Sequence, residues 1–170
     1  MTDRSAPTSS STMDLFAAPM HGSVEAIFLA GERGAPRTAV EHVRAVAATG
    51  LEGDRYFGHV RGGGKRDSER QVTLIEAEAV DAVRATGVVF APGDARRNVV
   101  TRGVRLNELV GRTFRVGGAL LRGVERCDPC SRLTRLTYRG VERDLRDRGG
   151  LRAEILESGD IRVGDAVDAA

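Results

Sequence analysis

Short apolar segments separated by glycine-containing turns limit what this chain can fold into more than any other feature of its sequence. The chain has 21 glycines among its 170 residues, and long helical patterns do not alternate regularly with apolar strands. A doubly wound parallel sheet, which needs that alternation, is therefore not expected. Many short strands joined by glycine turns predict a mostly β domain of the α+β class, closed into a barrel and carrying a few helices.

Apolar patterns and turn residues place the expected elements along the chain. Strands are expected at 22–30, 39–47, 72–74, 98–101, 114–116, 119–124, 151–156 and 161–167. Helices are expected at 76–83 and around 138–145, with a single helical turn at 106–110. Gly117 and Gly118 are typical of a hairpin turn between two of these strands.

Composition and charge limit the kind of protein further. A chain of 170 residues fits one domain with a substantial core, and its net charge of +2 gives no strong attraction to nucleic acid or membranes. No apolar run approaches the roughly 18 residues that a membrane span needs. Residues 1–20 are rich in Ser, Thr, Ala and Pro but lack the pattern of a signal peptide. We therefore expect a flexible tail at 1–20, a single domain at 21–170, and a cytoplasmic location.

The stretch from Asp94 to Cys130 carries the residue types most suited to ligand chemistry. It opens with Arg96, Arg97 and Asn98 and closes on both cysteines of the protein. Arginine presents a planar fork of donors that fits phosphate in a bidentate manner. A thiolate can hold a soft metal or carry sulfur. Together these residues predict an anionic cofactor whose reactive end meets a cysteine.

Two glycine-rich polar segments precede that stretch. Asp54 and Arg55 place a carboxylate beside a guanidinium in a tight turn, which suits either a local ion pair or a ligand-facing loop. The segment 62–65 is not expected to bind phosphate as a P-loop does. His59 stands where that motif needs glycine, and Arg66 stands where it needs a hydroxyl residue.

Cys127 and Cys130 form a Cys-x-x-Cys pair with several possible roles. A structural zinc site needs four ligands, but the chain has no second cysteine pair and its three histidines are scattered. A thioredoxin-like dithiol would need a βαβ setting, which the expected fold does not provide. Inert buried thiols do not suit the polar neighbours Asp128, Ser131 and Arg132. A functional thiol is the interpretation that these residues favour.

Six short motifs follow one another along the chain. They are Gly53-Asp54-Arg55, Val72-Thr73-Leu74-Ile75, Arg96-Arg97-Asn98-Val99-Val100, Gly111-Arg112-Thr113-Phe114-Arg115-Val116-Gly117, Cys127-Asp128-Pro129-Cys130 and Ile161-Arg162-Val163-Gly164-Asp165. In this order and spacing they resemble the MOSC family, whose members are related to the C-terminal part of molybdenum cofactor sulfurase. The resemblance covers roughly residues 22–167. It implies a β-barrel that binds a molybdenum-pterin cofactor or handles sulfur.

The resemblance also implies roles for particular residues. Family members of the amidoxime-reducing type hold molybdenum through a cysteine thiolate, and the matching cysteine here is Cys130, with Cys127 auxiliary. Their Arg-x-Asn segment matches Arg96 and Asn98. The expected cofactor-binding residues are Arg96, Asn98, Thr101, Arg102, Asp54 and Arg55. If 96–98 lie on a strand, Arg96 and Asn98 share one face and Arg97 points away.

Two functions of different class follow from this interpretation. The first is a molybdenum-dependent reductase of N-hydroxylated or N-oxygenated small molecules, served by an electron-donor protein. The second is a sulfur carrier that receives a persulfide on Cys130 from a cysteine desulfurase and passes it to a metal-sulfur cofactor. A cofactor-binding module without catalysis is a third possibility. Pyridoxal phosphate is not expected, because the only lysine, Lys65, lies in a glycine loop.

Overall fold

The computed structural model describes residues 21–59 and 71–170. The expected tail at 1–20 and the glycine loop at 62–65 lie outside the described residues. Within them the fold is mostly β, as expected from the glycine-rich turns and short apolar runs. No helix in the described part of the chain is long and apolar enough to cross a membrane.

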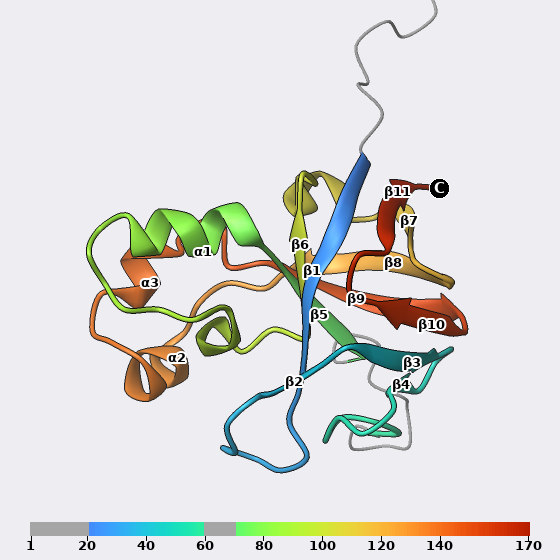
Figure 1. Ribbon diagram of the computed structural model, residues 1–170, viewed down its shortest axis with the longest axis horizontal. Helices are drawn as coiled ribbons and strands as arrows, with labels where there is room; N and C mark the ends of the chain where they lie inside the picture. The colour runs from blue at the N-terminus through green and yellow to red at the C-terminus, as the bar shows by residue number, and fades with distance from the viewer. Residues whose placement is uncertain (1–20, 60–70) are drawn as a thin grey trace, which may run out of the picture.

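Seven strands of the described chain close into a barrel (Figure 1). Around the barrel they follow the order β1 (His21–Leu29), β11 (Ala166–Ala169), β7 (Thr113–Val116), β8 (Ala119–Arg126), β9 (Leu151–Glu157), β5 (Val72–Glu76) and β6 (Val99–Arg102). Strand β6 then pairs with β1 and closes the ring. The β5–β6 pair is parallel, and the other pairs of the ring are antiparallel.

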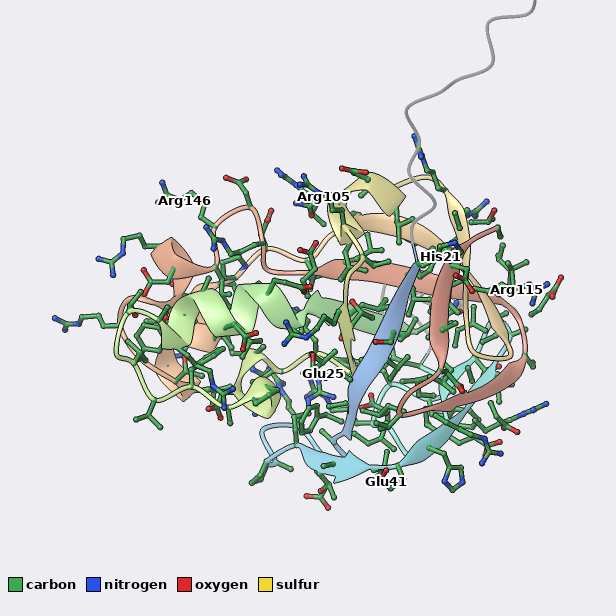
Figure 2. The ribbon with its side chains drawn as sticks, turned by 45° about the horizontal axis from the view of Figure 1, so that its top comes forward. His21, Glu25, Glu41, Arg105, Arg115 and Arg146 are labelled. Atoms are coloured by element: carbon green, nitrogen blue, oxygen red, sulfur yellow. The ribbon has the colours of Figure 1, made fainter. Side chains whose placement is uncertain are left out.

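Four further strands complete the described β-structure around this ring. Strand β2 (Thr38–Val40) extends the barrel sheet from the end of β1. A separate sheet has the order β10 (Gly159–Arg162), β3 (His42–Val46), β4 (Gly50–Leu51). The hairpin expected at Gly117 and Gly118 is present, with Val116 opposite Ala119 in the β7–β8 pair. Charged side chains such as Arg105, Arg115 and Arg146 cover the outside of the molecule (Figure 2).

The helices lie together on one outer side of the barrel (Figure 1). They are α1 (Ala77–Arg84), α2 (Ser131–Leu136) and α3 (Val141–Asp144), with the 3-10 turn η2 (Pro92–Ala95) beside them. A second 3-10 turn, η3 (Leu106–Leu109), lies apart from them at the top of the barrel in Figure 1, and Leu106 and Leu109 belong to the barrel core. Alternation along β5 explains why both faces of this part of the sheet are buried. Leu74 belongs to the core inside the barrel, whereas Ile75 belongs to the second core, under the helices. The parallel pair β5–β6 is thus covered on both faces, as parallel strands usually are.

Three of the expected elements are wrong in their extent. The strand expected at 39–47 is two strands, because the chain leaves β2 at Glu41 and enters the separate sheet as β3. The strand expected at 161–167 is also two, β10 and β11. Between them Gly164 adopts a φ of 91°, and the Asp165 carboxylate accepts a hydrogen bond from the backbone N–H of Arg162 (2.7 Å). This turn lets the chain pass from the small sheet to the barrel. The helix expected at 138–145 covers only Val141–Asp144.

Candidate functional site

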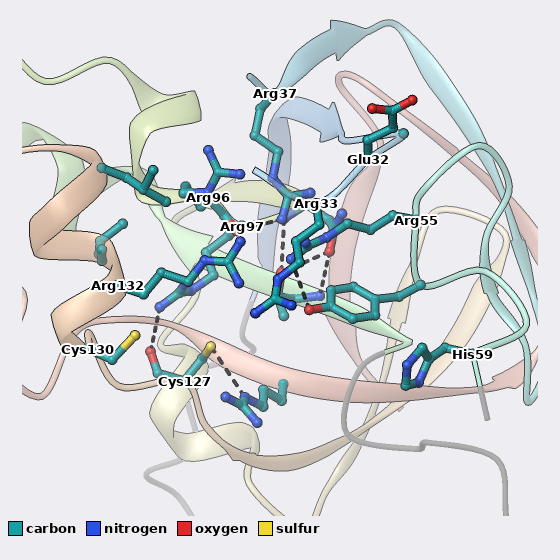
Figure 3. A pocket seen from close by; sticks show the side chains of 17 residues that line it. Glu32, Arg33, Arg37, Arg55, His59, Arg96, Arg97, Cys127, Cys130 and Arg132 are labelled. Atoms are coloured by element: carbon teal, nitrogen blue, oxygen red, sulfur yellow. Dashed lines mark hydrogen bonds between the residues drawn. The ribbon is translucent and has the colours of Figure 1, made fainter. Parts of the chain in front are cut away.

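A cavity of about 740 Å³ opens at the end of the barrel where β5 and β6 begin and β8 ends. Its size lies within the range of small-molecule binding sites. Thr73 and Asn98 line it from the starts of β5 and β6, and Leu133 and Leu136 line it from α2. Most of its charged lining is cationic: Arg33, Arg37, Arg55, Arg96, Arg97, Arg132 and Arg152 (Figure 3). Glu32 is the one acidic residue among the described lining residues.

Both cysteines line this cavity, and their environments differ. Cys130 is exposed and immediately precedes α2, which begins at Ser131. Cys127 is only 5% exposed, and its Sγ accepts a hydrogen bond from Arg152 Nε (3.5 Å). Both thiols are free. No three His, Cys, Asp or Glu side chains of the described residues cluster as metal ligands.

Arg97 fixes the loop that carries these cysteines. Its guanidinium donates to three backbone carbonyl oxygens, those of Gly149 (2.8 Å), Ala95 (3.1 Å) and Cys127 (2.8 Å). The three acceptors come from segments far apart in sequence, and Arg97 itself is buried. All three nitrogen atoms of the guanidinium are therefore used within the protein. Arg97 is a structural residue of the cavity wall.

Two glycines allow the same loop to approach the barrel closely. A Cβ at Gly149 would lie within contact distance of the Cys127 carbonyl oxygen and the Pro129 ring. Gly150 adopts a φ of 111°, and a Cβ there would overlap the carbonyl oxygen of Leu74. Backbone atoms cannot be moved aside as a flexible side chain can. Glycine at both positions is what brings β9 and the Cys127 loop against β5.

Asp54 and Asn98 form a buried hydrogen-bonded pair behind the cavity. Asp54 Oδ2 accepts from Asn98 Nδ2 (3.0 Å), Arg37 Nη1 (3.1 Å) and the backbone N–H of Ala30 (3.1 Å). Asn98 Oδ1 in turn accepts from the backbone and hydroxyl of Thr73 (3.2 and 2.9 Å). Asp54 does not line the cavity. Its carboxylate joins both ends of the loop between β1 and β2 to the start of β6.

Arg37, which donates to Asp54, lines the cavity with a buried guanidinium group. Its side chain is 6% exposed, and its Nη2 donates to the carbonyl oxygen of Arg96 (2.9 Å). Burial lowers the pKa of Arg37 below its usual value, while the Asp54 charge acts in the opposite direction. Its Nε has no hydrogen-bond partner among the described residues, and the same holds for Arg55 Nε. Buried donors without partners are rare in folded proteins and indicate a missing ligand or water.

The strand register expected for Arg96 to Asn98 is wrong. Strand β6 begins at Val99, and Arg96 adopts a left-handed backbone with a φ of 59° after η2. Arg96 Nη2 donates to the carbonyl oxygen of Ala35 (3.0 Å), so the side chain bridges to the loop before β2. Burial lowers the pKa of Arg96, and the charges of Arg55 and Arg132 lower it further. Arginine side chains are thus crowded around Arg96 with little opposite charge.

Comparisons with known proteins identify the family. The MOSC domain model matches residues 36–168, which is most of the chain. The chain belongs to the MOSC family. A sequence comparison with curated proteins gave no match.

Solved structures confirm the fold of this MOSC domain. The YuaD protein from Bacillus subtilis superposes with a TM-score of 0.74 at 18% identity, over 88% of this chain and 96% of that one. YiiM from Geobacillus stearothermophilus gives a TM-score of 0.68 at 15% identity, over 88% and 75% of the two chains. YiiM from Escherichia coli gives 0.59 at 18% identity, over 87% and 69%. Likenesses at this level of identity show a shared barrel fold.

The MOSC domain brings together some of the residues expected to form the site. Cys130, Arg96, Asn98 and Arg55 line the one cavity, from segments that are far apart in sequence. Three expected residues do not line it: Asp54, Thr101 and Arg102. Thr101 is fully buried in β6. Arg102 lies on the exposed surface, where it pairs with Glu25 (2.9 Å) and Asp81 (2.8 Å).

Besides Arg97, four arginines of the cavity were not expected from the sequence as ligand-facing residues: Arg33, Arg37, Arg132 and Arg152. Arg132 had a visible signal, because it lies two residues after Cys130 and contributes to the polar surroundings of the cysteine pair. Arg33, Arg37 and Arg152 had none. Each is brought to the cavity by strand pairing and loop packing that local sequence does not reveal.

Proposed function

We propose that this MOSC protein binds a molybdenum-pterin cofactor in the arginine-lined cavity and reduces N-hydroxylated or N-oxygenated small molecules. One observation carries the proposal. An exposed thiol, Cys130, lines the same cavity as several arginines that have no carboxylate partner among the described residues. A thiolate suits a soft metal, and unpaired guanidinium groups suit a phosphate.

The residues present fit such a cofactor. Arg55 and Arg96 are the cations best placed for its phosphate, because both line the cavity and their described contacts are with neutral groups. The free Nε atoms of Arg37 and Arg55 add donors that the protein leaves without partners. A pterin cofactor brings sulfur ligands of its own, which agrees with a site that offers one accessible thiol instead of a cluster.

Each part of the cavity then has a distinct task in the proposed reaction. The bound cofactor supplies oxygen-atom transfer, which takes up an electron pair and two protons and releases the oxygen as water. Cys130 would hold the metal, and Arg55 and Arg96 would hold the phosphate. Asp54 and Asn98 position Arg37 and the start of β6. We propose that the electrons come from a separate donor protein.

The role of Arg96 gives a direct test. Protein made in a host that produces the cofactor is analysed for molybdenum and, after oxidation, for pterin fluorescence. Arg96→Ala removes a charge-assisted contact to phosphate worth about 2 kcal/mol, so cofactor retention should fall roughly thirtyfold. Arg102→Ala is the matched control, because that arginine lies outside the cavity. Equal losses in both variants would count against the proposed phosphate site.

A sulfur carrier is the second candidate, and the exposure of Cys130 favours it. A carrier thiol must be accessible to accept a persulfide, and Cys127 on the same cavity wall could release the sulfur by forming a disulfide. The partner would be a cysteine desulfurase. Incubation with such an enzyme, followed by mass spectrometry, should then show a persulfide on Cys130. The arginines favour the reductase, because a carrier has no need of a phosphate site.

A further inference from the structure

The arginines of the cavity are more numerous than a single cofactor phosphate requires. Three of them are already committed within the protein. Arg97 donates to three carbonyl groups, Arg152 pairs with Glu125 (3.0 Å), and Arg37 pairs with Asp54 (3.1 Å). The remaining four, Arg33, Arg55, Arg96 and Arg132, have no carboxylate partner in the described parts of the chain.

A phosphate carries a charge of about −1.5 to −2 near neutral pH. Arg55 and Arg96 together balance it. Arg33 and Arg132 then remain as two cations facing the cavity, and Glu32 is the only acidic group on its described wall. Burial lowers the pKa of Arg96, and the like charges of Arg55 and Arg132 lower it further, so cations gathered here without an anion are costly. A second anion would remove that cost.

Arg132 is placed to meet this second anion close to the reactive thiol. It stands two residues after Cys130 at the start of α2, and its guanidinium extends toward Arg96 (Figure 3). Leu136 lies one helical turn further along α2 and also lines the cavity, on the same face as Arg132. This face of α2 therefore offers a cation next to an apolar surface. A small organic anion could place its charged end against the cation and its apolar body against the apolar surface.

We propose that Arg132 is a substrate-recognition residue and that the protein selects N-hydroxylated or N-oxygenated substrates that carry a carboxylate or a comparable anionic group. The anionic group pairs with Arg132, with Arg33 adding charge from the facing loop, and the apolar body lies against Leu136. The substrate class rests on the proposed reductase function. The anion site on α2 does not, since it follows from the described residues alone.

The test compares Arg132→Gln with Arg135→Gln, which removes an exposed arginine of the same helix that does not line the cavity. Substrates are benzamidoxime and 4-carboxybenzamidoxime, which differ in one carboxylate. The unaltered protein should show a KM at least tenfold lower for the carboxylate compound. Arg132→Gln should raise that KM about tenfold, with little change in kcat or in the KM for benzamidoxime. Arg135→Gln should leave all of these values unchanged.

Measurements of molybdenum content and of benzoate binding distinguish failure of the anion site from failure of the reductase function. If Arg132→Gln loses molybdenum while Arg135→Gln keeps it, Arg132 holds the cofactor and the proposal is overturned. Equal KM values for the two substrates in the unaltered protein also overturn it. If no molybdenum is found in any variant, the reductase function fails, but benzoate titration by calorimetry still decides the anion site. Benzoate binding that weakens about tenfold in Arg132→Gln alone supports the site, and binding that is absent or unchanged rejects it.

Discussion

Exposure distinguishes the two thiols of the cavity at the scale of single residues. Cys130 is exposed, whereas Cys127 is nearly buried and its sulfur accepts a hydrogen bond from Arg152. Alkylation with iodoacetamide near neutral pH should therefore label Cys130 several times faster than Cys127, as peptide mass spectrometry can measure. Cys130→Ala should abolish activity and Cys127→Ala should retain most of it. The opposite pattern would show that the functional thiol has been assigned to the wrong residue.

Arg97 gives a prediction about stability instead of ligand binding. Arg97→Ala leaves the buried carbonyl groups of Ala95, Cys127 and Gly149 without their donor. The free energy of unfolding should fall by about 3 kcal/mol, measured by urea denaturation. Arg97→Lys should recover little of this, because one ammonium group cannot reproduce three donors in a planar fork. The exposed Arg135→Ala should change stability by less than about 0.5 kcal/mol, and a similar effect of both changes would contradict the structural role.

Part of the site could be predicted from the sequence. The residues that could not be predicted depend on contacts between distant segments. Arg96, Asn98 and Cys130 stood out because their residue types suit phosphate and soft metals, and all three line the cavity. The family resemblance assigned Arg96 and not Arg97 to the ligand, but nothing in the local sequence shows that Arg97 is structural. Two of the three acceptors of Arg97 lie 30 and 52 positions away, in the Cys127 loop and at Gly149, so its role depends on tertiary packing. The left-handed backbone of Arg96 was hidden as well, since such a φ favours glycine.

Strand β11 decides at the scale of elements whether the barrel closes. It pairs with both β1 and β7, and Val167 lies opposite Gly22 on one side and Val116 on the other. Val167 is fully buried in the barrel core. Val167→Asp would place a carboxylate there without a partner and should prevent stable folding, seen as loss of the cooperative thermal transition. The neighbouring Asp168→Asn, on the outer face, is the control and should unfold much as the unaltered protein does.

Element types were easier to predict than element boundaries. The short strands, the hairpin and the helix after β5 follow from local patterns of apolar residues. The two long strands that proved to be pairs of strands share one cause. In each, the chain moves from one sheet to another while apolar residues continue on both sides of the change. The change of sheet depends on which partner strand lies alongside, and that information is not local.

Charge distribution is the feature of the whole molecule that matters most for function. A net charge of +2 implies no strong field, yet seven arginines and a single acidic residue line one cavity in the described chain. Elsewhere on the described surface several arginines are paired with carboxylates, as Arg115 is with Glu157 (3.0 Å). Such exposed pairs contribute little to stability. The overall balance conceals a local excess of positive charge, which the fold creates by bringing β1–β2, β6, β8 and α2 together at one end of the barrel.

Molybdenum and pterin content of the purified protein tests the central claim most directly. Protein from a cofactor-producing host should contain near-stoichiometric molybdenum and pterin. Cys130→Ser should lose most of the metal, because a thiolate ligand is removed, while Cys127→Ser should keep it. The claim would be contradicted by protein that lacks molybdenum and, after incubation with a cysteine desulfurase, gains about 32 Da, roughly one sulfur, on Cys130.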